Sequence, residues 1–142
     1  MYYSAVMPEH YELVWNKISD YMEGAAKYTH GRYSAQDIKE GLYKNSWQLW
    51  IAYDDNKIYG AVITEVIKYP RLNALVLHFT GGIKLKLWKD DMLSLLRGFA
   101  SANQCKTIES HGRVGWKKVF ENDGFKSKFM FYELPVEGYN ND

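Results

Sequence analysis

The sequence predicts a mixed α/β fold in which helices cover both faces of one sheet. Three apolar runs rich in β-branched and aromatic residues follow one another with short polar turns between them, which indicates an antiparallel meander. Beyond the meander, helical and strand patterns alternate, and such units pack helices against a sheet. The length of 142 residues suits one compact domain. We expect that domain at 1–135 and a polar tail at 136–142.

Two helices are expected before the first strand. Pro8 is typical of a first helical turn, where a missing N–H costs little, and the helical pattern that follows stops near Gly31. Ser34 and Asp37 form an S-x-x-D capping pattern that opens the second helix. The apolar positions of the two helices are Val14, Ile18, Tyr21, Met22, Ala25, Ile38 and Leu42.

Five segments have the composition of strands. Residues 47–53 and 57–67 flank an Asp-Asp-Asn turn and are expected to form a hairpin. Residues 74–79 are a near-continuous apolar run, which favours a central strand. The remaining strands are expected at 106–110 and 128–134. The predicted order is therefore helix, helix, three antiparallel strands, helix, strand, helix, strand.

The two later helices separate these last strands. The first of them has an amphipathic pattern, and the second is expected at 113–122, with Gly124 as its C-cap. The apolar positions of the first are Trp88, Met92, Leu95, Leu96 and Phe99.

Composition and charge exclude several classes of function. The net charge of +1 gives no large footprint for nucleic acid, and Asp90 and Asp91 interrupt the lysines around Trp88, which favours a solvated helix face. A single cysteine, Cys105, and four scattered histidines have no metal-ligand spacing. No apolar run approaches the roughly 20 residues of a membrane span, and the N-terminus lacks the pattern of a signal peptide. We expect no metal, nucleic acid or membrane as a partner.

The last third of the chain carries motifs of a known family. The segment GWKKVFENDGF, followed by a strand, resembles the closing helix, Gly-Phe turn and next strand of the GCN5-related N-acetyltransferases (GNAT). The pattern W-x16-C-x5-HGRVGW-x7-GF, which begins at Trp88, is similar to small acetyltransferase-like proteins of tailed phages, where a GRxGW segment follows the short strand. The element order resembles that of the family along nearly the whole chain. The resemblance implies a GNAT-like fold.

A glycine-containing stretch follows the central strand, where active members of the family have an R/Q-x-x-G-x-G/A loop. In that loop, backbone N–H groups and the following helix hold the coenzyme A pyrophosphate. In this chain the glycines are adjacent, and Asp90 and Asp91 are expected in the first helical turn, where carboxylates repel phosphate. The alternative is a plain glycine turn with a helix cap. The residues that the resemblance implies for acetyl-CoA binding are Phe79, Thr80, Gly81, Gly82, Ile83 and Lys84.

The proton chemistry of acetyl transfer needs a base for the amine proton and often an acid for the departing thiolate. The resemblance places that acid, a tyrosine in many members, at the position of Phe120, which has no hydroxyl. Glu65 on the second strand and His78 on the central strand are the candidate bases. The alternatives are a carboxylate on a solvated face and a structural histidine.

Three further residues that are candidates to bind a substrate or an anion follow the strand expected at 106–110. His111 and Arg113 follow that strand, and Trp116 lies one turn into the next helix, where α/β folds usually place ligands. Arg113 can hold a carboxylate or phosphate in two hydrogen bonds. The alternative is that Arg113 binds backbone carbonyls while Trp116 packs in the core.

Two functions remain open from the sequence. The adjacent glycines and Phe120 favour a non-catalytic, phage-type acetyltransferase-like protein that acts in particle assembly or host interaction. Its partners would be a phage or host protein or a second copy, and its location the host cytoplasm or the virion. The alternative is an acetyl-CoA-dependent N-acetyltransferase that acts on an amine. Aromatic residues that favour a protein interface where exposed are Trp47, Trp50, Tyr53, Phe129, Phe131 and Tyr132.

Overall fold

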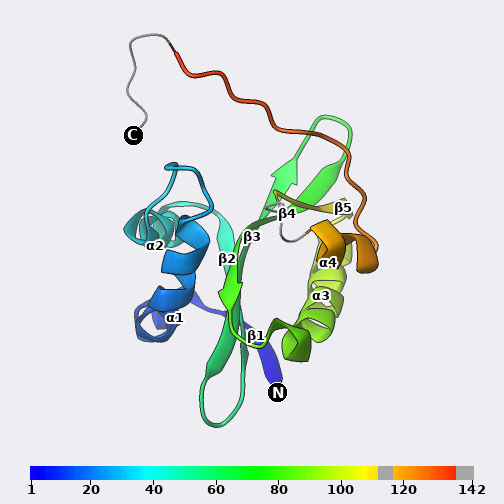
Figure 1. The fold of residues 1–142 in the computed structure, drawn as a ribbon. Helices are drawn as coiled ribbons and strands as arrows, with labels where there is room; N and C mark the ends of the chain where they lie inside the picture. The colour runs from blue at the N-terminus through cyan, green and yellow to red at the C-terminus, as the bar shows by residue number, and fades with distance from the viewer. Residues whose placement is uncertain (112–116, 137–142) are drawn as a thin grey trace. The chain divides into compact units, whose positions relative to one another are not determined.

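The computed structural model describes residues 1–111 and 117–136. The chain divides into two compact units, 1–111 and 112–142. Figure 1 shows a sheet with helices in the first unit, and a short helix with an extended C-terminal segment in the second. The single-domain boundary at 1–135 stays a prediction.

The first unit is built on a five-stranded sheet with the order β1-β2-β3-β4-β5. Neighbouring strands from β1 to β4 are antiparallel, whereas β4 and β5 are parallel. The predicted mixed α/β class and the predicted meander are therefore confirmed. The strands are β1 (Tyr2–Val6), β2 (Trp47–Tyr53), β3 (Ile58–Lys68), β4 (Asn73–Gly82) and β5 (Cys105–Ser110).

Strand β1 is not among the segments that the sequence predicts. Its five residues are too few to show a strand period clearly. It forms because the edge of β2 offers a partner, with a regular register from Tyr2 opposite Tyr53 to Val6 opposite Leu49. Tertiary pairing, rather than local pattern, decides this element.

Helices cover both faces of the sheet (Figure 1). One core cluster joins the first two helices to side chains such as Ile63 and Phe79. The other joins the third helix to Trp50 and Leu75 on the opposite face. Both faces of the sheet are therefore buried, as the apolar strands predict. The helices are α1 (Tyr11–Ala26), which follows a 3-10 turn at Pro8–His10, α2 (Ala35–Lys44) and α3 (Leu85–Ala102).

The pairing of β4 changes on both of its sides near His78. Ile63 pairs with Phe79 and Thr64 pairs with Leu77, so His78 is an extra residue in a β-bulge between β3 and β4. On the other side of β4, the parallel pairing with β5 ends at Leu77 and Ser110, although β4 continues to Gly82. The two changes occur at neighbouring residues of one strand.

The predicted capping box at the start of α2 is confirmed. The Asp37 backbone N–H donates to Ser34 Oγ (3.1 Å), and the Ser34 backbone N–H donates to Asp37 Oδ2 (2.9 Å). These bonds lower the pKa of the Asp37 carboxyl, the Ser34 backbone contact having the larger effect. Since the folded pKa lies below the unfolded one, this contribution to stability is present above the unfolded pKa and is lost as pH falls through the folded pKa.

Substitution of this cap is expected to destabilise the chain moderately. Ser34→Ala removes the acceptor for the Asp37 N–H and should lower the free energy of unfolding by about 1 kcal/mol. Urea denaturation followed by circular dichroism would measure the loss. Ser101→Ala, an exposed serine within α3, is the matched control and should change the value by less than about 0.5 kcal/mol. Equal effects of the two substitutions would contradict the capping role.

The second unit contains α4 (Lys117–Asn122) and its predicted cap at Gly124, which is confirmed. Gly124 has a φ of +92°, and the Phe125 N–H donates to the Phe120 carbonyl (2.9 Å). The rings of Phe120 and Phe125 lie 5.0 Å apart. These features together make a Schellman cap with its usual apolar contact.

The strand predicted at 128–134 is wrong for this structure, because the segment forms neither strand nor helix. A strand needs a hydrogen-bonded neighbour, and the sheet among the described residues ends at β5. Large apolar side chains of the segment are exposed, as Phe129 (94%) and Leu134 (89%) illustrate. The others are Met130, Phe131 and Tyr132.

Candidate functional site

The two candidate bases lie in direct contact. Glu65 on β3 and His78 on β4 are joined by a hydrogen bond of 2.7 Å between Oε1 and Nε2. Their side chains are 27% and 26% exposed, respectively, so the pair is accessible from solvent but largely enclosed. The structure thus brings together two residues that the sequence separates by a turn and most of two strands.

A third residue, which sequence reasoning did not assign to the site, completes the cluster. The Trp47 indole N–H donates to the same Glu65 Oε1 at 3.1 Å. The Trp47 ring lies 5.2 Å from the His78 ring, centroid to centroid. Its signal in the sequence is weak, because only the register of β2 and β3 shows that residue 47 stands opposite residue 65.

Strand geometry explains why these side chains converge. Trp47 and Glu65 are direct cross-strand partners, and such partners point to the same face of a sheet. His78 and Phe79 are sequence neighbours that would normally point to opposite faces, but the bulge breaks that alternation. Phe79 is buried in the core on the α1 side, and the His78 and Phe79 rings lie 6.0 Å apart.

The chemistry of the pair follows from its donors and acceptors. An ionised carboxylate only accepts hydrogen bonds, and an indole N–H only donates. If Glu65 is ionised, neutral His78 donates from Nε2 and keeps a lone pair on Nδ1. The arrangement can therefore take up a proton on the imidazole while the neighbouring carboxylate stabilises the charge that forms.

The stretch for which the sequence left a phosphate loop and a plain glycine turn open is mostly strand, which corrects both interpretations. Thr80, Gly81 and Gly82 belong to β4 and pair with Val62, Ala61 and Gly60 of β3. The Ile83 N–H donates to the Tyr59 carbonyl at 2.8 Å. Backbone groups from Lys84 onward are therefore better placed for an anion than those of the glycines.

The adjacent glycines have a packing role. A Cβ at Gly81 would collide with the Tyr21 carbonyl of α1, and a Cβ at Gly60 would collide with the Trp88 ring. Gly82, with a φ of +151°, faces Gly60 and Trp88 in the same way. The Trp88 indole N–H then donates to the Ile83 carbonyl at 2.9 Å. The glycines therefore allow α1 and α3 to approach the sheet.

The expected repulsion of phosphate by carboxylates in the first turn of this helix is also corrected. α3 begins at Leu85, with Lys84 as N-cap, and its first turn contains no acidic residue. Asp90 and Asp91 lie in the second turn, where Asp91 accepts from the Tyr3 hydroxyl. The helix begins earlier than predicted, directly after Lys84, which has a left-handed conformation with a φ of 52°.

Of the three residues predicted to bind a substrate or an anion, the structure describes one. His111 is exposed after the end of β5. Arg113 and Trp116, with the rest of the GRxGW segment, lie outside the described residues, so their expected roles stay predictions. Within the described part of the chain, no group of three or more His, Cys, Asp or Glu side chains is arranged to hold a metal. The described helices include none with the length and apolarity to span a membrane.

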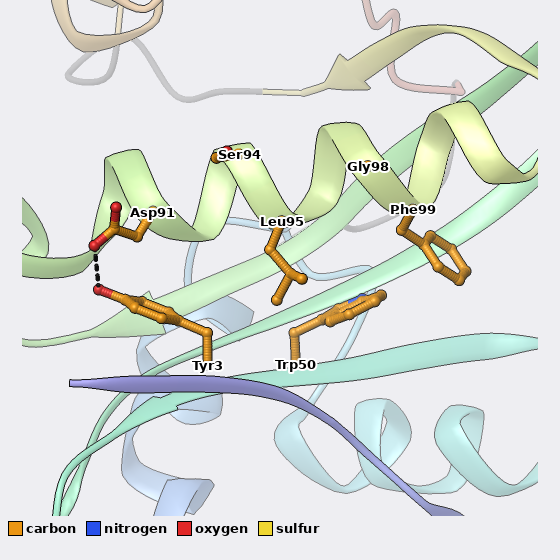
Figure 2. A pocket seen from close by; sticks show the side chains of 7 residues that line it. All are labelled: Tyr3, Trp50, Asp91, Ser94, Leu95, Gly98 and Phe99. Carbon is orange, nitrogen blue, oxygen red and sulfur yellow. Dashed lines mark hydrogen bonds between the residues drawn. The ribbon is translucent and has the colours of Figure 1, made fainter.

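A hollow of about 690 Å³ lies between β1 and α3, on the face of the sheet that α3 covers (Figure 2). Its floor is Trp50, whose ring meets the Phe99 ring edge-on at 5.0 Å. At its rim the Tyr3 hydroxyl donates to Asp91 Oδ2 (3.1 Å), and burial with this bond raises the pKa of Tyr3. None of the predicted site residues lines this open hollow, which also includes Ser94, Leu95 and Gly98.

Solved structures with a similar fold include acetyltransferases. No protein-family model matches the chain, and no curated protein matches it in sequence. Among solved structures, a probable acetyltransferase is 17% identical, with a TM-score of 0.72 over 98% of this chain and 100% of that one. Ribosomal-protein-alanine N-acetyltransferase from Brucella melitensis is 13% identical, with a TM-score of 0.73 over 96% of this chain and 100% of that one.

A GNAT family acetyltransferase from Staphylococcus aureus is also similar in fold. It is 14% identical, with a TM-score of 0.69 over 95% of this chain and 98% of that one. At such low identity these likenesses establish the fold alone. The chain has the GNAT fold that the sequence predicted, whereas the link to phage proteins stays a prediction.

Proposed function

We propose that this protein is an acetyl-CoA-dependent N-acetyltransferase that acts on a primary amine. The observation that carries the proposal is the Glu65–His78 pair at the bulge of β4, one residue beyond the point where β4 and β5 stop pairing. A candidate base and the end of the β4–β5 pairing thus occur at neighbouring residues of one strand. The fold shared with solved acetyltransferases supports the same reading.

We assign the pantetheine arm of acetyl-CoA to the part of β4 that does not pair with β5. β4 continues from His78 to Gly82 without pairing to β5. Backbone N–H and C=O groups on that side of β4 need partners other than β5, and the amides of a pantetheine chain can supply them. The Phe79 side chain does not lie at this edge of β4, because it is buried in the core on the α1 side.

The start of α3 fits the phosphates of the same molecule. Lys84, the N-cap, and Lys86, in the first turn, are both exposed, and the N-cap makes no side-chain capping hydrogen bond. The positive end of the helix and two ammonium groups favour an anion there. Lysine binds phosphate as a point charge, so this site requires no glycine-rich loop.

The base would act on the amine. Acetyl-CoA supplies the acetyl group as a thioester; a C–N bond forms, the C–S bond breaks, and the amine loses one proton. His78 Nδ1 is the atom we assign to that proton, and Glu65 stabilises the resulting imidazolium. Phe120 offers no acid for the sulfur, but a thiol of ordinary pKa near 8.5 leaves as thiolate without one.

A second candidate function is a non-catalytic protein that binds a protein partner. The pairing of Thr80, Gly81 and Gly82 with β3 favours it, because a paired strand does not wrap around a pyrophosphate as a loop does. The exposed apolar side chains from Phe129 to Leu134 favour it as well, since exposed aromatic clusters are typical of interfaces. A phage or host protein, or a second copy, would then be the partner.

Calorimetric titration of acetyl-CoA separates the two functions. We expect micromolar binding to the wild-type chain and at least about tenfold weaker binding to Lys84→Glu, which reverses the charge at the start of α3. Lys27→Glu, at the end of α1, is the matched control and should bind like the wild type. Absence of heat at millimolar acetyl-CoA would refute the enzyme and favour the protein-binding function.

A further inference from the structure

When Glu65 is ionised, one of its oxygens accepts from two donors on two different strands. The Trp47 N–H of β2 and the His78 Nε2 of β4 both reach Oε1, at 3.1 and 2.7 Å. A glutamate side chain is flexible, and at 27% exposure it can turn toward water. A single bond to His78 would leave the carboxylate free to make that turn, whereas a second donor opposes it.

Trp47 is itself held firmly enough to act as an anchor. A Cβ at Gly41 of α2 would collide with the Trp47 ring, so the indole lies directly against the helix backbone. Its ring also contacts Phe79, at 5.8 Å between centroids, in addition to His78. The indole N–H therefore has a fixed direction toward β3, where Glu65 is its cross-strand partner.

We propose that Trp47 is a positioning residue of the base: its indole N–H holds the Glu65 carboxylate where His78 can bind it. Gly41 takes part by leaving room for the indole. The kinetic part of this proposal rests on the proposed acetyltransferase function, whereas its structural part does not. Trp47 would not touch either substrate, so its effect should appear in turnover rather than in binding.

Steady-state kinetics tests the functional part. Trp47→Phe keeps an aromatic ring and removes the N–H, and kcat is expected to fall about tenfold, the usual effect of one hydrogen bond to a charged group. The KM for acetyl-CoA should stay within about twofold, because the start of α3 is unchanged. Trp15→Phe, another buried tryptophan on the same face, is the control for lost ring volume. A fall in kcat no larger than that of the control overturns the proposal.

Nitrogen-15 NMR of the unliganded protein tests the structural part without any activity. The ring nitrogens of His78 are expected to shift in Trp47→Phe toward their values in Glu65→Ala, since both variants weaken the Glu65–His78 bond. Unchanged His78 resonances in Trp47→Phe overturn the proposal. If this shift is seen and acetyl transfer is not, the proposed function fails while the positioning role stands.

Two further NMR measurements test the proposal if Trp47→Phe does not fold. Gly41→Ala retains the indole N–H but displaces the ring, and it should shift the His78 resonances in the same direction. Glu65→Ala, in which Trp47 is retained, can also be compared with the wild type. The indole N–H resonance of Trp47 should differ between these two chains, and that of Trp15 should not. An unmoved Trp47 resonance in Glu65→Ala overturns the proposal.

Discussion

Trp88→Ala is expected to lower the free energy of unfolding by about 3–5 kcal/mol, as large-to-small changes of buried aromatics do. The side chain is 2% exposed and belongs to the core cluster between α3 and the sheet. Its indole N–H also satisfies the Ile83 carbonyl at 2.9 Å. Total stabilities of domains are about 5–15 kcal/mol, so this one substitution removes a large part. Urea denaturation would measure the loss.

The matched control lies on the same helix. Leu87→Ala changes a side chain that is 60% exposed, and it should alter the free energy of unfolding by less than about 0.5 kcal/mol. A loss below about 1 kcal/mol for Trp88→Ala would show that the α3 contact with the sheet is not a main source of stability.

The partner of Trp88 on the sheet allows a sharper test by a double-mutant cycle. Gly60→Ala forces a Cβ into the Trp88 ring, and overpacking of this kind costs about 1–3 kcal/mol. In a Trp88→Ala background the ring is absent, so Gly60→Ala should be nearly neutral. The expected coupling is therefore above about 1 kcal/mol. Equal costs in both backgrounds would contradict the packing role of Gly60.

The fold was predictable because the local signals agree with one another. The capping pattern of Ser34 and Asp37, the strand 47–53 and the cap at Gly124 all appear as expected. In each case neighbouring residues determine the structure by themselves. β1 and the segment 128–134 depend instead on whether another strand offers an edge, and local composition carries no information on that.

The site was predictable in part, for a similar reason. Glu65 and His78 were chosen by chemistry, but their contact depends on the bulge that makes His78 an extra residue, which nothing in the local sequence indicates. The sequence left a phosphate loop and a plain turn open for Gly81 and Gly82, whereas their neighbours Tyr21, Gly60 and Trp88 require small residues at those positions. Long-range packing therefore decided what adjacent glycines do.

Removal of His78 is expected to have the largest effect on activity. If acetyl transfer is observed, His78→Ala should lower kcat by about 10²–10⁴-fold, the usual contribution of a general base. The KM for acetyl-CoA should change little, since Lys84 and Lys86 are retained. Initial rates of thiol release with a panel of primary amines would measure both. His10→Ala, an exposed histidine before α1, is the control and should leave the rate unchanged.

The kcat values of the two single variants and the double variant are expected to show whether His78 or Glu65 takes the proton. If His78 takes it and Glu65 stabilises the charge, Glu65→Ala should reduce kcat strongly in the wild type but have little further effect in His78→Ala, because both act in one step. If Glu65 were the base, the double variant would be no slower than Glu65→Ala, while His78→Ala alone would cost less than Glu65→Ala. Independent, multiplicative losses would contradict both assignments, since two groups joined by a 2.7 Å hydrogen bond must act together.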